Sequence, residues 1–120
     1  MSNNSFKSAQ RVLIFDGTGR FVSRVGSMQA ASKLSFVKPQ SVSFACSGKY
    51  ISAGGFYYRR ENSNVKLEEE DWNNLRLTEY DKLCGEKRTY HSRKVMAKKY
   101  QAIADKLNPP NQRRKDKRNE

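Results

Sequence analysis

Few side chains in this sequence have the type and spacing that catalysis needs. His91 is the only histidine, which excludes the paired-histidine motifs that bind a catalytic metal. Cys46 and Cys84 lie far apart in the chain, without the Cys-x-x-Cys spacing of a zinc or redox site. The carboxylates of Glu68 to Asp71 are consecutive and lack the separated partner that general acid–base or two-metal chemistry uses. We therefore expect a protein that is not an enzyme and that has no metal and no cofactor.

Positive charge is the chemistry that the sequence does supply. The chain has 24 lysines and arginines against 12 aspartates and glutamates, a formal net charge of +12 in 120 residues. The balance is +8 in residues 1–60, −4 in residues 61–80 and +8 in residues 81–120. Such an alternation indicates either partners of both signs or contact between the two basic halves and the acidic belt.

Strand-forming residues and glycines organise residues 11–60. Val12 to Phe15 is a strand-like run, Asp16 to Gly19 is a turn and Phe21-Val22 returns, which together predict a β-hairpin. Gly54 to Tyr58 ends the segment with a glycine bend and an aromatic strand, which is expected to cover either the hairpin or the helices between.

Two short helices are predicted between these strands. Ser27 is suited to cap the first helix, Pro39 fits the first turn of the second, and Gly48 can end it. Cys46 falls on the apolar face of the second helix, where it acts as a small hydrophobic residue. The predicted core includes Val12, Ile14, Phe21, Val22, Ala31, Leu34, Val42 and Phe56.

The residues of this segment resemble a known family. The matching positions are Phe15-Asp16-x-x-Gly19-Arg20-Phe21-Val22, Ser27-Met28 with Ala30-Ala31, Leu34, Val42-Ser43 and Gly54-Gly55-Phe56-Tyr57. This pattern resembles the nuclease-associated modular domain of type 1, a DNA-binding appendage of homing endonucleases that also occurs in phage proteins. The resemblance covers about half of the chain. It implies that residues 41–47 form the recognition helix of a helix-turn-helix, the element that enters a major groove; the alternative is a compact scaffold without sequence recognition.

The second half of the sequence predicts a connector followed by helices. Residues 61–77 form an acidic connector that contains Trp72, and residues 78–107 form a helical extension. Within the extension, Thr78 is expected to cap a short helix, and a longer amphipathic basic helix is expected between Ser92 and Leu107. Trp72 either packs against residues 11–60 or, together with Tyr80, anchors an interface with a partner.

The termini complete an α+β fold made of a small β-hairpin, a helix-turn-helix, C-terminal helices and extended basic arms. Residues 1–10 are an N-terminal arm and residues 11–60 the module. Residues 108–120 are a basic tail, in which Asn108 is followed by Pro109-Pro110. The residues expected to contact nucleic acid or an acidic partner are Lys38, Gln40, Ser41, Ser43, Lys49, Arg93, Lys94, Lys98, Lys99, Arg113, Arg114, Lys115, Lys117 and Arg118.

Three functions fit these observations. The first is a non-catalytic basic structural protein of a large assembly; the phage members of the resembling family suggest an auxiliary capsid protein of a tailed phage, present in the virion or in the host cytoplasm before assembly. Its arms would dock on neighbouring subunits. The second is a DNA-binding module of the homing-endonuclease-associated type, and the third is a ribosome-associated protein. The expected partners are other subunits and DNA, and no membrane, because no apolar run approaches the roughly 20 residues that span a bilayer.

Overall fold

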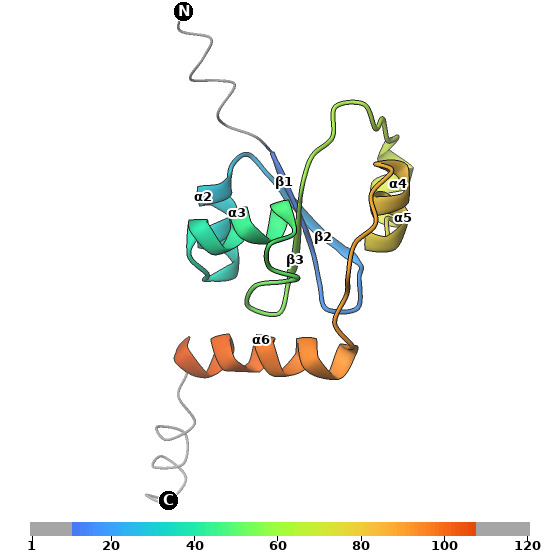
Figure 1. The fold of residues 1–120 in the computed structure, drawn as a ribbon. Coiled ribbons are helices and arrows are strands. Elements are labelled where there is room, and N and C mark those ends of the chain that lie inside the picture. Colours follow the sequence, from blue (N-terminus) through green and yellow to red (C-terminus); the bar gives the residue numbers. More distant parts are fainter. Residues whose placement is uncertain (1–10, 108–120) are drawn as a thin grey trace, which may run out of the picture.

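The computed structural model describes residues 11–107, which form an α+β fold (Figure 1). Three antiparallel strands make one sheet in the order β2-β1-β3, and helices lie on both of its sides. The elements are β1 (Val12–Phe15), β2 (Phe21–Val25), α2 (Met28–Ser35), α3 (Pro39–Ser47), β3 (Tyr57–Arg60), α4 (Glu69–Asn73), α5 (Leu77–Leu83) and α6 (Arg93–Leu107). The predicted arms, residues 1–10 and 108–120, lie outside the described residues.

The predicted hairpin is confirmed, and the aromatic segment adds a third strand to it. The side chain of Asp16 accepts hydrogen bonds from the backbone N–H groups of Thr18 and Arg20 at 2.9 and 3.0 Å, which fixes the turn between β1 and β2. Gly19 takes a φ of 88°, a conformation that favours glycine. Strand β3 pairs with the other edge of β1, with Ile14 opposite Tyr58, so β1 is the central strand.

Strand β1 is buried on both faces, because each face of the sheet carries its own core. Val12 and Ile14 point to a core shared with α2, α3 and Tyr58. Leu13 and Phe15 point to the opposite core, which residues of the second half of the chain complete. Alternation along a strand directs successive side chains to opposite faces. Residues 61–107 therefore supply most of the side chains that cover this face of the sheet, which residues 11–60 alone would leave largely exposed.

Helix α2 begins, and helix α3 begins and ends, where the sequence predicts. The Ser27 hydroxyl accepts a hydrogen bond from the N–H of Ala30 at 3.1 Å and caps α2. Pro39 opens α3, and Gly48 ends it with a φ of 96°. Cys46 is buried as expected, and burial raises the pKa of its thiol to about 11.

The prediction that Val22 and Leu34 belong to the core is wrong. Val22 and Leu34 are 49% and 51% exposed, whereas Val12, Ile14, Ala31 and Val42 are fully buried, as expected, and Phe21 and Phe56 are partly buried. Val22 lies on an edge strand whose side chains alternate between half-buried and exposed positions. In α2, the buried residues are Ala31 and Ser35, one turn apart, and this stripe turns Leu34 towards solvent.

The segment predicted as an acidic connector contains the short helix α4. The carboxylate of Asp71 accepts a hydrogen bond from the N–H of Glu68 at 3.0 Å and closes its first turn. Trp72 packs against Phe21 with ring centroids 5.1 Å apart. Of the two alternatives for Trp72, the structure therefore has the one in which it packs against residues 11–60. Helix α5 begins at Leu77, with Arg76 rather than Thr78 as its N-cap.

Tyr80 is a core residue, and its prediction as an interface anchor is wrong. Its side chain is 1% exposed and lies in the second core with Leu77 and Met96. The hydroxyl donates to the carbonyl of Arg60 at 3.1 Å and accepts from the N–H of Asn62 at 2.7 Å. Because both the ring and the hydroxyl are used inside the fold, Tyr80 is inaccessible to a partner.

A buried ion pair fixes α5 to the sheet. Nε and Nη2 of Arg59 donate to the two carboxylate oxygens of Asp81 at 2.8 and 3.0 Å, and both side chains are 4% exposed. Tyr90 donates its hydroxyl to Asp81 at 2.6 Å, and burial together with that carboxylate raises the pKa of Tyr90 to about 12. Tyr57 accepts a hydrogen bond from the N–H of His91 at 2.9 Å, which holds the chain just before α6.

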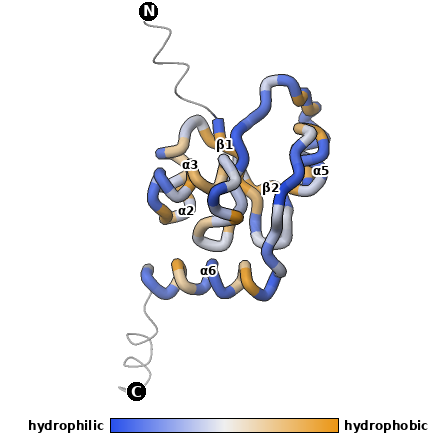
Figure 2. Tube along the Cα trace, in the orientation of Figure 1, coloured by the Kyte–Doolittle hydropathy of each residue, from blue (hydrophilic) through white to orange (hydrophobic). Residues whose placement is uncertain are grey.

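Helix α6 crosses one end of the sheet, near the hairpin turn and the Gly54–Gly55 bend (Figure 1). A Cβ atom on Gly55 would lie 2.4 Å from Cβ of Tyr100, and one on Gly17 would lie 2.8 Å from Cβ of Met96. The helix thus packs on glycine backbone at two points. Figure 2 shows hydrophilic and hydrophobic residues alternating along α6. Met96 is 1% exposed, whereas Tyr100 on the same helix is 52% exposed. Within residues 11–107, no helix has the length and apolar character needed to cross a bilayer.

Candidate nucleic-acid interface

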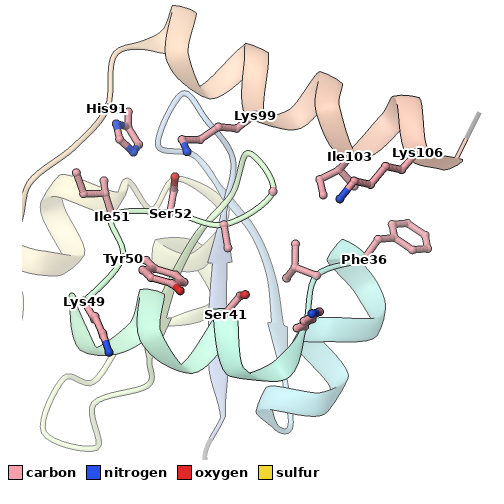
Figure 3. Close-up of a pocket in the computed structure, with 14 residues that line it drawn as sticks. Phe36, Ser41, Lys49, Tyr50, Ile51, Ser52, His91, Lys99, Ile103 and Lys106 are labelled. Atoms are coloured by element: carbon pink, nitrogen blue, oxygen red, sulfur yellow. The ribbon is translucent and has the colours of Figure 1, made fainter. Parts of the chain in front are cut away.

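A groove of about 790 Å³ runs between α3 and α6 (Figure 3). One wall is the N-terminal half of α3 and the residues just before it, the other is α6, and the floor is the loop of residues 49–54. Its polar side chains are those of Lys38, Ser41, Lys49, Tyr50, Ser52, His91, Lys99 and Lys106. The groove therefore joins basic residues that are far apart in the sequence.

Glycine contacts hold the two walls of the groove in place. Gly54 adopts a φ of 63°, and a Cβ atom there would lie 2.6 Å from Val37 and 3.3 Å from Ile103. Val37 belongs to the link between α2 and α3, and Ile103 to α6. A side chain at position 54 would push these two segments apart, so the width of the groove depends on glycine.

The electrostatic character of the groove is uniformly basic. Its lining contains four lysines, namely Lys38, Lys49, Lys99 and Lys106, and no aspartate or glutamate among the described residues. All four ion pairs found within residues 11–107 use arginine, so the lysine charges are not neutralised by this part of the fold. A cluster of like charges in a concave site concentrates positive potential and attracts polyanions.

His91 lies at one end of the groove. Burial lowers the pKa of its imidazole, and the positive charge of Lys99 lowers it further. The side chain is consequently neutral at pH 7 and gains a proton only in more acidic solution. The groove thus has a fixed positive charge from its lysines and an additional one that depends on pH.

Two exposed aromatic side chains flank the lysines. Phe36 is 60% exposed and Tyr50 is 43% exposed. The rings of Tyr50 and Phe44 meet at a steep angle, with their centroids 5.1 Å apart. The ammonium of Lys49 lies 4.3 Å from the centroid of the Phe44 ring. Phe36 and Tyr50 lie towards opposite ends of the groove, as Figure 3 shows. Proteins that bind single strands stack nucleic-acid bases on aromatic rings and place cations beside these rings to contact the phosphates.

The structure brings together only some of the residues that the sequence singled out. Lys38, Ser41, Lys49 and Lys99 line the groove. The predicted residues that do not line it are Gln40, Ser43, Lys94, Lys98 and Arg93, of which Arg93 borders a separate, smaller cavity next to the hairpin turn. Arg113, Arg114, Lys115, Lys117 and Arg118 lie outside the described residues.

Sequence reasoning missed Phe36, Tyr50, His91 and Lys106 as parts of a common site. A local signal existed for Lys106, since it follows Lys99 by seven positions and so lies on the same side of α6. Phe36 and Tyr50 each stand next to a helix end, where an aromatic residue has no single interpretation. Their shared position depends on the packing of α6 against the Gly54–Gly55 bend.

No protein-family model matches the chain, and neither a curated protein nor a solved structure matches it. The resemblance of residues 11–60 to the nuclease-associated modular domain of type 1 therefore stays a prediction.

Proposed function

We propose that this protein is a non-catalytic structural component of a large assembly, and that its form is an auxiliary capsid protein of a tailed phage. The observation that carries the proposal is the separation of charge across the fold. Exposed carboxylates from Glu68 to Asp71 lie at the α4 end, and the lysine groove lies on the side of α3, with the sheet between them (Figure 1). Such a molecule can dock on a basic neighbour at one end and on a polyanion at the other.

The use of arginine and lysine supports this role. Arg24 and Arg59 are committed to internal pairs with Glu61 and Asp81. None of the ion pairs among residues 11–107 uses a lysine of the groove, so these lysines can contact a partner molecule. Surface charges of this kind steer association and fix orientation, and their effect decreases as salt increases.

A second candidate is a DNA-binding module of the helix-turn-helix type. Helices α2 and α3 form a consecutive helix pair, and Gln40 near the start of α3 is exposed, as a recognition residue requires. Lys38 precedes the helix and Lys49 follows it, in positions to contact phosphates on either side. Under this alternative, the α4 carboxylates have no role in binding.

The test of the assembly proposal starts with particles from infected cells, separated on a density gradient and probed for this chain. The proposal requires the chain to sediment with capsids at a fixed ratio to the major shell protein. Capsids that form without the chain are then mixed with wild type or with the Glu69→Gln/Glu70→Gln variant. We expect the variant to occupy fewer sites, most clearly at low salt.

Three outcomes contradict the proposal. A chain found free in the lysate, with none on capsids, rules out the assembly role. Equal occupancy of capsids by the wild type and the acidic-end variant at every salt concentration removes α4 from the docking mechanism. Tight binding to one short duplex, lost in Gln40→Ala, establishes the DNA-binding alternative instead.

A further inference from the structure

Phe36 ends α2 through a hydrogen bond from its backbone N–H to the carbonyl of Ser32, in a conformation that usually belongs to glycine. It follows α2 as the C-cap residue with a φ of 59°, and it is the only non-glycine residue among residues 11–107 with a positive φ. Helices commonly place glycine in this left-handed conformation, because a bulky side chain there is strained. With 60% of the side chain exposed, burial does not compensate for that strain. Strain of this kind is characteristic of functional positions.

The surroundings of Phe36 indicate what the ring contacts. It stands at one end of the lysine groove, with Lys38 two residues away on one wall and Lys106 on the other (Figure 3). Tyr50 and Lys49 stand at the other end, and Ser41 and Lys99 line the stretch between. Each end of the groove therefore holds an exposed aromatic ring and at least one lysine.

We propose that this groove binds single-stranded nucleic acid, with lysines on the phosphates and with bases stacked on Phe36 and Tyr50. Stacking is possible only for unpaired bases, because those of a duplex are covered by their neighbours. An acidic peptide would satisfy the lysines but leave both rings in water. The proposal rests on the proposed function only in using the lysine groove as a polyanion surface.

The lining of the groove also sets the expected selectivity. Besides its lysines and His91, the groove offers the hydroxyls of Ser41, Tyr50 and Ser52. It contains none of the amide or carboxylate side chains that read base edges in pairs. Binding should accordingly depend on strand character and salt more than on sequence.

The conformation of Phe36 makes a discriminating variant available. Phe36→Gly removes the ring and relieves the positive-φ strain, so the fold should be retained or become more stable. Leu34→Ala is the matched control, since Leu34 is an apolar residue of the preceding helix, 51% exposed, that does not line the groove. Circular dichroism and urea unfolding of each variant confirm that the fold is intact.

For charge, Lys38→Gln/Lys106→Gln is compared with Lys94→Gln/Lys98→Gln. Both variants lose two positive charges, but only the first pair lines the groove.

Binding is measured by fluorescence anisotropy with a labelled mixed-sequence single-stranded oligonucleotide, a duplex of the same length and a polyglutamate peptide. We expect the single strand to bind most tightly and Phe36→Gly to weaken it roughly tenfold or more, with Leu34→Ala unchanged. We also expect Lys38→Gln/Lys106→Gln to reduce the salt dependence more than its control does.

The measurements separate the possible failures. If Phe36→Gly binds the single strand as wild type does, the strand proposal is wrong. If Lys38→Gln/Lys106→Gln nevertheless weakens binding of the duplex or of polyglutamate more than its control does, this face still acts as a polyanion surface. If groove and control lysine pairs behave alike for all three probes, both proposals lose their site.

Discussion

Removal of Asp81 tests the ion pair that joins the two halves of the chain. Asp81→Ala leaves the guanidinium of Arg59 buried, with Nε and Nη2 deprived of both carboxylate oxygens. It also removes the acceptor of the Tyr90 hydroxyl. Since each partner of the pair is only 4% exposed, water cannot replace these contacts without opening the interface between α5 and β3.

The expected size of the effect follows from this burial. Breaking a buried ion pair by deleting one partner costs about 3–5 kcal/mol, whereas replacing both partners with apolar groups is often close to neutral. For a slope of about 1.5 kcal/mol/M in urea, a loss of that size lowers the unfolding midpoint by about 2–3 M. Arg59→Met/Asp81→Ala should therefore be more stable than Asp81→Ala alone.

The assay is urea unfolding of wild type, both single variants and the double variant, followed by circular dichroism and tryptophan fluorescence. The signal of Trp72 reports on the core where it contacts Phe21. A midpoint shift of less than about 0.5 M for Asp81→Ala would refute the argument from burial. Additive effects of the two single changes would refute direct coupling, because coupled neighbours deviate from additivity by about 0.5–3 kcal/mol.

Three further predictions concern the glycine contact and the titrating groups. Gly55→Ala should loosen α6 and weaken oligonucleotide binding, because its Cβ meets helix backbone, whereas Gly26→Ala, with open space around it, should leave binding unchanged in the same anisotropy assay. Oligonucleotide affinity should rise as pH falls through the depressed pKa of His91, and His91→Gln should flatten that profile. The hydrogen bond from Arg24 lowers the pKa of Glu61. The stabilisation that this bond gives to the fold is therefore present above a pH of about 4.5 and is lost as pH falls through the lowered pKa. The difference in urea midpoint between wild type and Glu61→Gln should accordingly vanish in acid.

Local chemistry in the sequence determined the elements of residues 11–60. The run Val12 to Phe15, the cap at Ser27, the proline at position 39 and the glycine at position 48 each act within a few residues of themselves. Elements specified in this way were predicted with nearly correct bounds. The groove residues Lys38, Ser41, Lys49 and Lys99 were also predicted as contact residues, because charge and exposure follow from residue type and helix position.

Tertiary packing decided which faces became interior. Leu34 was predicted in the core and Tyr80 at an interface, yet Leu34 is half exposed and Tyr80 is buried. The difference arises because the sheet has two faces, and residues 61–107 cover the second one with Tyr80 included. A pattern of spacing along one helix does not tell which neighbouring element will cover it.

The groove itself is a product of the tertiary structure alone. Helix α6 lies about fifty residues beyond α3 in the sequence, and it forms the opposite wall because Gly54 and Gly55 let it approach the bend before β3. The sequence determined that the chain carries lysines and aromatic residues near these helix ends. Only the long-range packing of α6 placed Phe36, Tyr50 and the four lysines around a common cavity.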